Sequence, residues 1–268
     1  MLARVSTYWS IAAAAFRQHS TYRLATVAGV FTNSVFGLIR ASIMFAAIGT
    51  AGGELSGYTL AQAATYVWLG QALLAPIEAF GTREVAQRVH QGEVAVDLLR
   101  PTSFLGLYYA QKLGRSGFLL LGRGIPPLLI GAAVTGIALP EDPASYLLGI
   151  PSLLLAITVA FLADMMVNLA AFWLLETRGL TVVYTAVMNL LSGFLIPIVW
   201  FPDWLLALAR ATPFPSMIQT PIDTLSGRIP PLEALPLIGV QLGWVAVLSL
   251  AAWVMLRAGV RSLEVQGG

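Results

Sequence analysis

The sequence contains no cysteine, and Lys112 is its only lysine. The absence of cysteine excludes disulfides, thiolate catalysis and cysteine-ligated metals. A phosphate-binding loop of the form Gly-x-x-x-x-Gly-Lys-Ser/Thr needs a lysine behind glycines, whereas Lys112 lies in LYYAQKLG. No Gly-x-Ser-x-Gly or His-Glu-x-x-His occurs, and His19 and His90 are far apart, so neither a common hydrolase site nor a metal site is expected. No catalytic residue is therefore predicted.

Charge is also scarce. Only 10% of the residues are charged and 57% are hydrophobic, against about 25% and roughly 45–50% in ordinary soluble domains. So many apolar side chains do not fit into one soluble core. The net charge of +2 makes nucleic acid an unexpected partner. The composition predicts an all-α integral membrane protein whose main surroundings are the lipid bilayer.

Six apolar runs approach the length of about 20 residues that a helix needs to cross the hydrocarbon layer. Arg123 with Pro126-Pro127 interrupts the third run, and Asp164 lies in the fourth. The predicted spans are Thr26–Gly49, Leu60–Phe80, Gly117–Leu139, Tyr146–Leu175, Val182–Trp200 and Ala234–Leu256. We find no repeat and no linker, so a single domain over 1–268 is expected.

The basic residues set the orientation, because positively charged loops stay in the cytoplasm. With both termini inside, only Arg210 and Arg228 fall clearly on the outer side, and the first two outer loops carry Glu54, Glu141 and Asp142 but no base. The cytoplasmic set is then Arg4, Arg17, Arg23, Arg83, Arg88, Arg100, Lys112, Arg115, Arg178, Arg257 and Arg261. We expect a multi-pass protein of the cytoplasmic membrane with both termini in the cytoplasm.

Residues 1–22 have two readings. A short apolar stretch after Arg4 is compatible with a signal peptide. Arg17, His19 and Arg23 follow at once, however, and another apolar run begins, so cleavage would leave a second start signal. The favoured prediction is an uncleaved amphipathic helix in the membrane interface, with Val5, Tyr8, Trp9 and Ile11 to Phe16 on or near its apolar side.

Residues 81–104 form the most charged stretch of the chain. Charges of both signs alternate with apolar residues, which predicts a short amphipathic helix at the cytoplasmic surface, broken near Gly92 and ended by Pro101. A plain connecting loop is the alternative, although the segment is long for one. Its apolar residues are Val85, Val89, Val94, Val96, Leu98 and Leu99.

Charged residues inside the spans need partners or water, because an ionised side chain is costly in a membrane. Asp164 and Asn168 are one helical turn apart and share a face, which suits either a polar path or a contact with a base such as Arg40. A structural ion pair or a subunit contact is an equal alternative. Glu176 and Arg178 are expected to end the fourth span at the cytoplasmic surface.

Two motifs resemble the permease subunit of type-2 ABC transporters, in the branch of stand-alone six-span permeases. The first is Asp97-Leu-Leu-Arg-Pro101 after the second span. The second is a pattern after the fifth span, and PSMIQTPIDTLSGR (215–228) adds to the likeness. The residues of the second pattern are Ser192, Gly193, Pro197, Phe201, Pro202, Trp204, Leu205, Thr212, Pro213 and Phe214.

The resemblance implies a function for both motifs. The cytoplasmic segment would hold the coupling helix that docks on a separate ATPase, which binds ATP and Mg²⁺ itself. Residues 201–233 would form short re-entrant helices at the outer side, beside a path made with a second permease, identical or related. The coupling candidates are Glu84, Arg88, His90, Gly92, Glu93, Asp97 and Arg100, although Val94-Ala95-Val96 departs from the usual pattern of the family.

Three functions follow in decreasing order of support. The first is an ATP-driven exporter of amphipathic molecules, drugs or lipid-like substrates. The second is an ion-coupled carrier that uses Asp164 or Arg40, against which the lack of a repeated half argues. The third is a membrane-embedded enzyme or a structural anchor, which the lack of a clustered His, Asp or Ser constellation disfavours.

Overall fold

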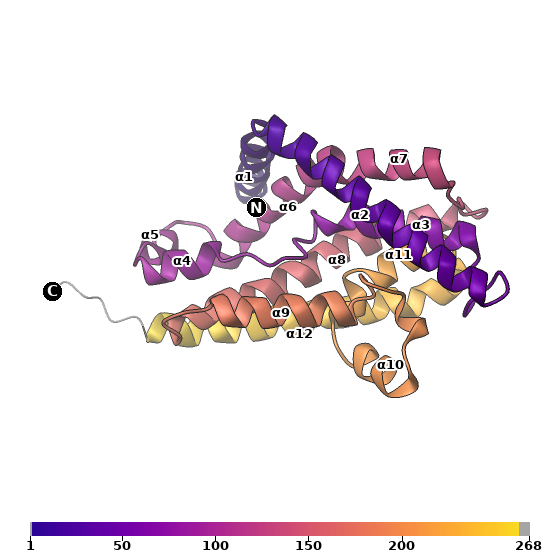
Figure 1. The fold of residues 1–268 in the computed structure, drawn as a ribbon. Coiled ribbons are helices and arrows are strands. Elements are labelled where there is room, and N and C mark those ends of the chain that lie inside the picture. Colours follow the sequence, from indigo (N-terminus) through magenta and orange to yellow (C-terminus); the bar gives the residue numbers. More distant parts are fainter. Residues whose placement is uncertain (1, 263–268) are drawn as a thin grey trace.

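The computed structural model describes residues 2–262, and within them every regular element is helical. Met1 of the predicted N-terminal helix and residues 263–268 lie outside this range. The long helices run roughly along one direction (Figure 1). The N-terminal helix, α4, α5 and the end of the last helix lie toward one end of the bundle.

Within residues 2–262, four helical stretches are long and apolar enough to cross a membrane. Three of them begin and end within a few residues of the predicted first, fourth and sixth spans. The four stretches are α2 (Arg23–Thr50), α6 (Phe104–Leu119) continued by α7 (Ile125–Thr135), α8 (Ala144–Leu169) continued by a 3-10 turn to Phe172, and α12 (Pro231–Arg261).

The other two predicted spans coincide with shorter helices. α3 (Leu60–Leu74) and α9 (Arg178–Leu191) have 15 and 14 residues, or about 22 and 21 Å. Turns follow α3 as far as Phe80, and a bend and a 3-10 turn (Ile198–Trp200) follow α9. The count of six spans therefore stays a prediction.

The third span begins earlier than predicted. Its helix starts at Phe104 rather than near Gly117, because the Ser103 side chain caps it by accepting a hydrogen bond from Gly106 N at 3.2 Å. Lys112 and Arg115, assigned from the sequence to a loop, therefore lie within the helix. Pro126-Pro127 does not break the span, because a π-helical turn (Leu120–Gly124) precedes the prolines and they start α7.

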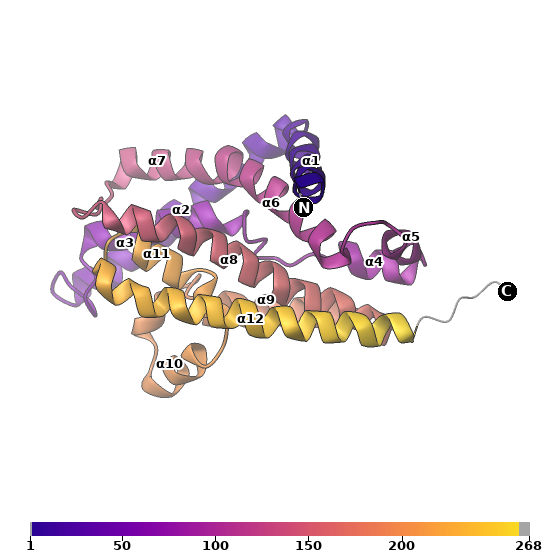
Figure 2. The same ribbon diagram turned by 180° about the vertical axis from the view of Figure 1, so that it is seen from behind.

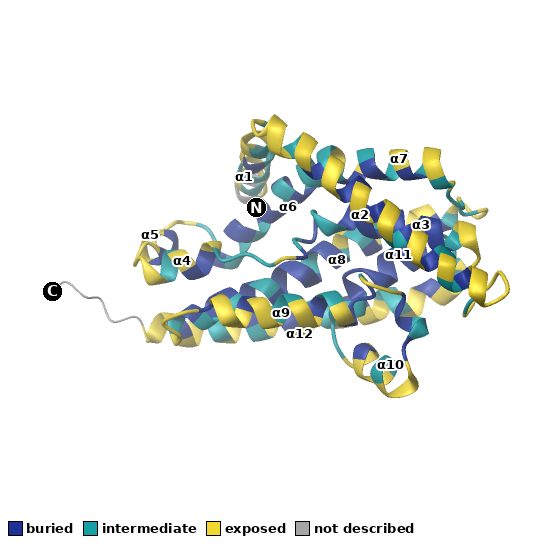
Figure 3. Cartoon of the chain, in the orientation of Figure 1, coloured by how far each residue is buried: buried dark blue, intermediate teal, exposed yellow. Residues whose placement is uncertain are grey.

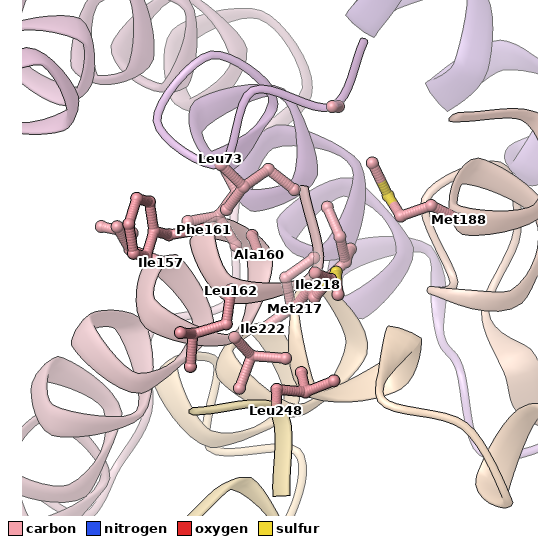
Figure 4. Close-up of a cluster of buried hydrophobic side chains, with 14 of the residues drawn as sticks. Leu73, Ile157, Ala160, Phe161, Leu162, Met188, Met217, Ile218, Ile222 and Leu248 are labelled. Carbon is pink, nitrogen blue, oxygen red and sulfur yellow. The ribbon is translucent and has the colours of Figure 1, made fainter. Parts of the chain in front are cut away.

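The core forms around α8. Ile157, Ala160, Phe161 and Leu162 of α8 are buried against Leu73 of α3, Leu248 of α12 and the segment 217–222 (Figure 4). α12 runs alongside α8, as the opposite view shows (Figure 2). α11 (Gln219–Leu225) is buried between α3 and α8, whereas α10 (Asp203–Arg210) projects from the bundle with most of its surface exposed (Figure 3).

α1 (Leu2–Ser20) packs along α6. The two backbones approach so closely that a Cβ built on Gly114 would lie 1.9 Å from Ala12 O. Tyr8 and Phe16 face α6, whereas Val5 and Trp9 are exposed. The predicted apolar side is thus divided between a protein contact and a free face. The interfacial position of α1 stays a prediction.

We expect Gly114→Ala to destabilise the contact between α1 and α6 by about 1–3 kcal/mol, because the new methyl group would meet backbone that cannot rotate away. The unfolding midpoint in detergent measures the effect. Gly239→Ala in α12 is the control, since a Cβ there meets nothing within 4 Å. Equal midpoints for the two variants would contradict the close packing.

Candidate functional site

Residues 81–104 form two short helices separated at the expected glycine. The chain turns at Gly81 with φ +69°, forms α4 (Glu84–His90), turns again at Gly92 with φ +76°, and forms α5 (Val94–Leu98). Both glycine conformations lie in the left-handed region that other residues rarely adopt. The predicted break near Gly92 is therefore confirmed. Together α4 and α5 make the projecting tip of one end of the bundle (Figure 1).

Asp97 is an internal partner rather than an exposed contact residue. It is only 3% exposed, accepts hydrogen bonds from Arg88 Nε at 2.5 Å and Tyr108 Oη at 2.7 Å, and lies 3.4 Å from Arg100 Nε. Arg88 also pairs with Glu93 at 2.8 Å. The hydrogen bond to Asp97 raises the pKa of Arg88. Arg88 and Asp97 thus fix α4 against α5 and α6.

The outward surface of the tip combines apolar and charged groups. Val96 and Leu99 are 58% and 85% exposed, whereas Val85 and Val94 are buried, so the apolar residues of this segment do not share one side. The exposed residues among the coupling candidates are Glu84, His90, Gly92, Glu93 and Arg100. The tip therefore exposes two large apolar side chains beside charged ones.

Asp164 and Asn168 lie on one face of α8, as expected from their spacing, and this face holds the start of α4. Asp164 accepts hydrogen bonds from the backbone N of Thr82, at 2.9 Å, and from the Thr82 hydroxyl. Asn168 accepts from Ala86 N at 3.1 Å and donates to Thr82 O at 2.9 Å. We call this group of four residues the α8 bracket.

The end of α8 adds two more contacts to the same segment. Arg83 pairs with Glu176, and His90 Nε2 lies 2.9 Å from Leu174 O. The Arg178 backbone N–H, which donates to Glu176 at 2.7 Å, lowers the pKa of that carboxyl. Glu176 thus connects the region after α8 with both Arg83 and the start of α9.

A partly buried ion cluster attaches the turns after α3 to α6. Glu78 binds Lys112 Nζ and Arg115 Nε, both at 2.7 Å, and Arg115 Nη1 lies 3.3 Å from Glu84. Lys112 is only 2% exposed. Its charge is acceptable there because Glu78 compensates it directly. Lys112 and Arg115 are therefore structural cations, not free loop charges.

At the other end of the bundle, the motif from Ser192 to Pro213 shapes a return of the chain. Gly193, with φ +86°, ends α9, and a Cβ there would lie 2.6 Å from both Tyr66 Oη and Gln219 Oε1. Pro197 precedes the 3-10 turn, and Pro202 precedes α10. The remaining motif residues are Ser192, whose carbonyl accepts from Gln219 N at 3.1 Å, buried Phe201, exposed Trp204, and Pro213 before a further 3-10 turn.

Buried polar side chains fix this return. The Tyr66 hydroxyl lies 2.5 Å from Gly193 O and 2.7 Å from Gln219 Oε1, and Gln219 Oε1 also accepts from Ile198 N at 3.1 Å. Gln219 Nε2 donates to Asp223 at 2.8 Å, and Asp223 pairs through both oxygens with Arg228 at 2.7 and 2.8 Å. Arg228 also covers the Tyr58 ring at 4.9 Å. We call the five side chains that make these contacts the return cluster: Tyr58, Tyr66, Gln219, Asp223 and Arg228.

Sequence reasoning missed the return cluster. Gln219 and Asp223 are four residues apart in α11, so their common helical face could have been found from the sequence. Tyr58 and Tyr66 give no such signal, because tyrosine is enriched at membrane interfaces in general and their hydrogen-bond partners are more than 120 residues away.

Arg40 and Asp164 do not meet. Arg40 Nη2 donates to Phe194 O and lies 3.5 Å from Leu195 O, beside the return, whereas Asp164 contacts Thr82 and Asn168. The contact considered from the sequence is therefore not formed. Within residues 2–262, no group of three or more His, Asp or Glu is placed to hold a metal ion.

The comparison with protein families covers both motifs. The family model described as ABC-2 family transporter protein matches residues 35–267. The chain belongs to this family. It is the permease component of an ABC transporter. Its partners are the lipid membrane in which it lies and an ABC ATPase. The searches of curated proteins and of solved structures gave no match.

In this permease, Arg228→Gln should lower the free energy of unfolding by about 3 kcal/mol, because it leaves the Asp223 carboxylate buried without its charged partner. Unfolding by denaturant in micelles measures the change. The double variant Asp223→Asn/Arg228→Gln should recover part of it, since the unpaired charge is removed.

Arg210→Gln is the matched control for Arg228→Gln. Arg210 is the exposed arginine that ends α10, so its replacement should change the free energy of unfolding by at most about 0.5 kcal/mol. An effect of Arg228→Gln as small as this would show that the ion pair does not hold the return.

Proposed function

We propose that this chain is a six-span export permease that pairs with a second, identical or related permease and docks through α4–α5 on an ABC ATPase. The ATPase binds ATP and Mg²⁺. The observation that carries the proposal is the tip: α4–α5 projects with Val96 and Leu99 exposed, while its other side is held by the α8 bracket. A surface loop without a partner needs neither exposed apolar side chains on its outer side nor such bonds to α8 on its inner side.

The positions of the first helix and of the end of the last helix support six spans with both termini in the cytoplasm. α4–α5, the N-terminal helix and the end of α12 lie at one end of the bundle (Figure 1). With six alternating spans, α4–α5 and the region after α8 would lie in the cytoplasm, where Arg83, Arg88 and Arg178 agree with the positive-inside rule. The apolar groove of about 860 Å³ between α1 and α6 supports the interfacial position of α1 in the cytoplasmic membrane.

The contacts of the tip supply a route for the mechanical step. ATP-driven closure of the ATPase would displace α4–α5. The α8 bracket and the Arg83–Glu176 pair pass this displacement to α8. The Arg115–Glu84 pair and the Glu78 cluster would pass it to α6 and to the turns after α3. Hydrogen bonds and ion pairs join the tip to these elements, so it moves with them and not as a free loop.

The other end has the properties of an outer gate. α10 is exposed, α11 is buried against α3 and α8, and the return cluster ties α11 to the end of α9 and to the 3-10 turn before α10. Irregular backbone at membrane depth is possible only where protein or water satisfies it, and the side chains of Tyr66 and Gln219 do so here. The proposed substrates are amphipathic small molecules, drugs or lipid-like molecules, to which a largely apolar path is suited.

Leu99→Asp should weaken association with the ATPase by at least about tenfold, because it places an unpaired charge in an apolar contact. Co-purification of the permease with its ATPase at graded concentrations measures the loss. Leu232→Asp is the control: Leu232 is 81% exposed at the start of α12, at the opposite end of the bundle. Equal association for both variants would contradict the docking site.

An ion-coupled carrier is the alternative, and transport in inverted vesicles separates the two functions. The proposal predicts that transport stops when the ATPase carries a substitution that abolishes hydrolysis, and continues when proton and sodium gradients are collapsed. Asp164→Asn should lower the stability by about 1–3 kcal/mol and leave this pattern unchanged, because Asp164 bonds Thr82. Gradient-driven transport that Asp164→Asn abolishes would establish the carrier.

A further inference from the structure

Arg40 is a cation inside a span that has no carboxylate partner within residues 2–262. It lies in α2, ten residues or about 15 Å before the helix ends at Thr50. The ion pairs in this part of the chain involve other basic residues: Arg83, Arg88, Arg100, Lys112, Arg115 and Arg228. The charge of Arg40 is therefore not neutralised by the described part of the chain.

The guanidinium is only partly satisfied by its surroundings. Nη2 donates to Phe194 O, and Cζ lies 4.5 Å from the centre of the Phe194 ring. Nε and Nη1 are buried and have no hydrogen-bond partner. Since Nε carries one hydrogen and Nη1 two, three of the five N–H groups lack an acceptor. Nη1 lies near Gly70 of α3, 3.6 Å from where a Cβ would stand, so the guanidinium lies beside α3.

Arg123 is the useful comparison, because it also lies in a predicted span and forms no ion pair within the described residues. It packs against Gly29, six residues or about 9 Å from the start of α2, so its side chain can reach the polar interface. Only its Nε is both buried and unbonded. Its charge can therefore be solvated without a ligand, whereas Arg40 is deeper and has more N–H groups without an acceptor.

We propose that Arg40 binds the acidic group of the transported molecule, so that the substrates are anionic amphiphiles. A carboxylate, sulfate or phosphate is the acceptor that an unbonded guanidinium favours most. Ile39 and Ile43 of α2 and Leu195 after α9 are exposed beside it and offer an apolar surface for a chain. The inference rests on the proposed permease function, because it concerns the molecule that the permease moves.

The position of Arg40 also connects binding with the outer gate. Phe194 and Leu195, whose carbonyls lie next to Arg40, follow Gly193 directly. Gly193 is held by Tyr66 of the return cluster. A movement of this turn would therefore change the contacts of Arg40, and the site that binds the acidic group would change with the gate.

Competition by a matched series of ligands tests the proposal. The purified permease in neutral detergent is labelled with a photoactivatable fatty acid at about pH 8, where a carboxylate is ionised. Undecanoate, decyl sulfate, decanol and decyltrimethylammonium then compete, and these share a ten-carbon alkyl chain and differ only in the head group. The two anions should prevent labelling at concentrations at least about tenfold lower than the alcohol and the cation require.

Variants assign the preference to Arg40. Arg40→Gln should abolish the preference for anions without changing competition by decanol, Arg40→Lys should retain part of it, and Arg123→Gln should retain all of it. Equal competition by all four ligands in the unmodified chain would overturn the proposal, as would an unchanged preference in Arg40→Gln. Should Arg40→Gln fail to fold, the ligand series on the unmodified chain and on Arg40→Lys still decides.

Two further measurements distinguish the remaining cases. Arg40→Gln should still associate with the ATPase, so a loss of anion preference is separate from a failure of the proposed function. Light scattering of the same variant reports the association of two permeases. If Arg40→Gln separates them and keeps the anion preference, Arg40 binds a carboxylate of the second permease and the proposal is wrong.

Discussion

Side chains that bond free backbone groups are the constraint on which this structure depends. A chain surrounded by lipid has no water to satisfy an interrupted helix, so each interruption needs an internal partner. Asn168 bonds Thr82 O and Ala86 N after the α3 region, and Ser116 bonds Pro76 O. Tyr66 and Gln219 bond Gly193 O and Ile198 N after α9. The segments to which we assign a function are these interruptions.

The same requirement explains what the sequence could predict. Long apolar runs fixed the positions of α2, α8 and α12 to within a few residues, because an uninterrupted helix satisfies its own backbone. The turn at Gly92 could also be predicted, because its left-handed backbone conformation favours glycine. Even the common face of Asp164 and Asn168 followed from their spacing alone.

The rest could not be read from one sequence, because it depends on contacts between distant residues. The start of α6 was placed too late, since Lys112 and Arg115 resemble loop residues until Glu78 is brought to them. Asp97 resembles an exposed contact residue until Arg88 and Tyr108 enclose it. Tyr58 and Tyr66 acquire a role only when α11 folds back against α3. In each case the pairing, not the residue type, determines the role.

α8 is attached to both functional ends of the molecule. At one end its Asp164 and Asn168 hold the start of α4; at the other its Gly149 packs against Leu225 of α11. Fifteen residues, or about 22 Å, separate these two points on one helix. Tilting such a rod by about 5° around one point moves the other by about 2 Å. α8 is thus a lever: a movement at Asp164 would open or close the contact between Gly149 and α11. Pro151 lies inside the helix next to Gly149 and is the position where α8 would bend.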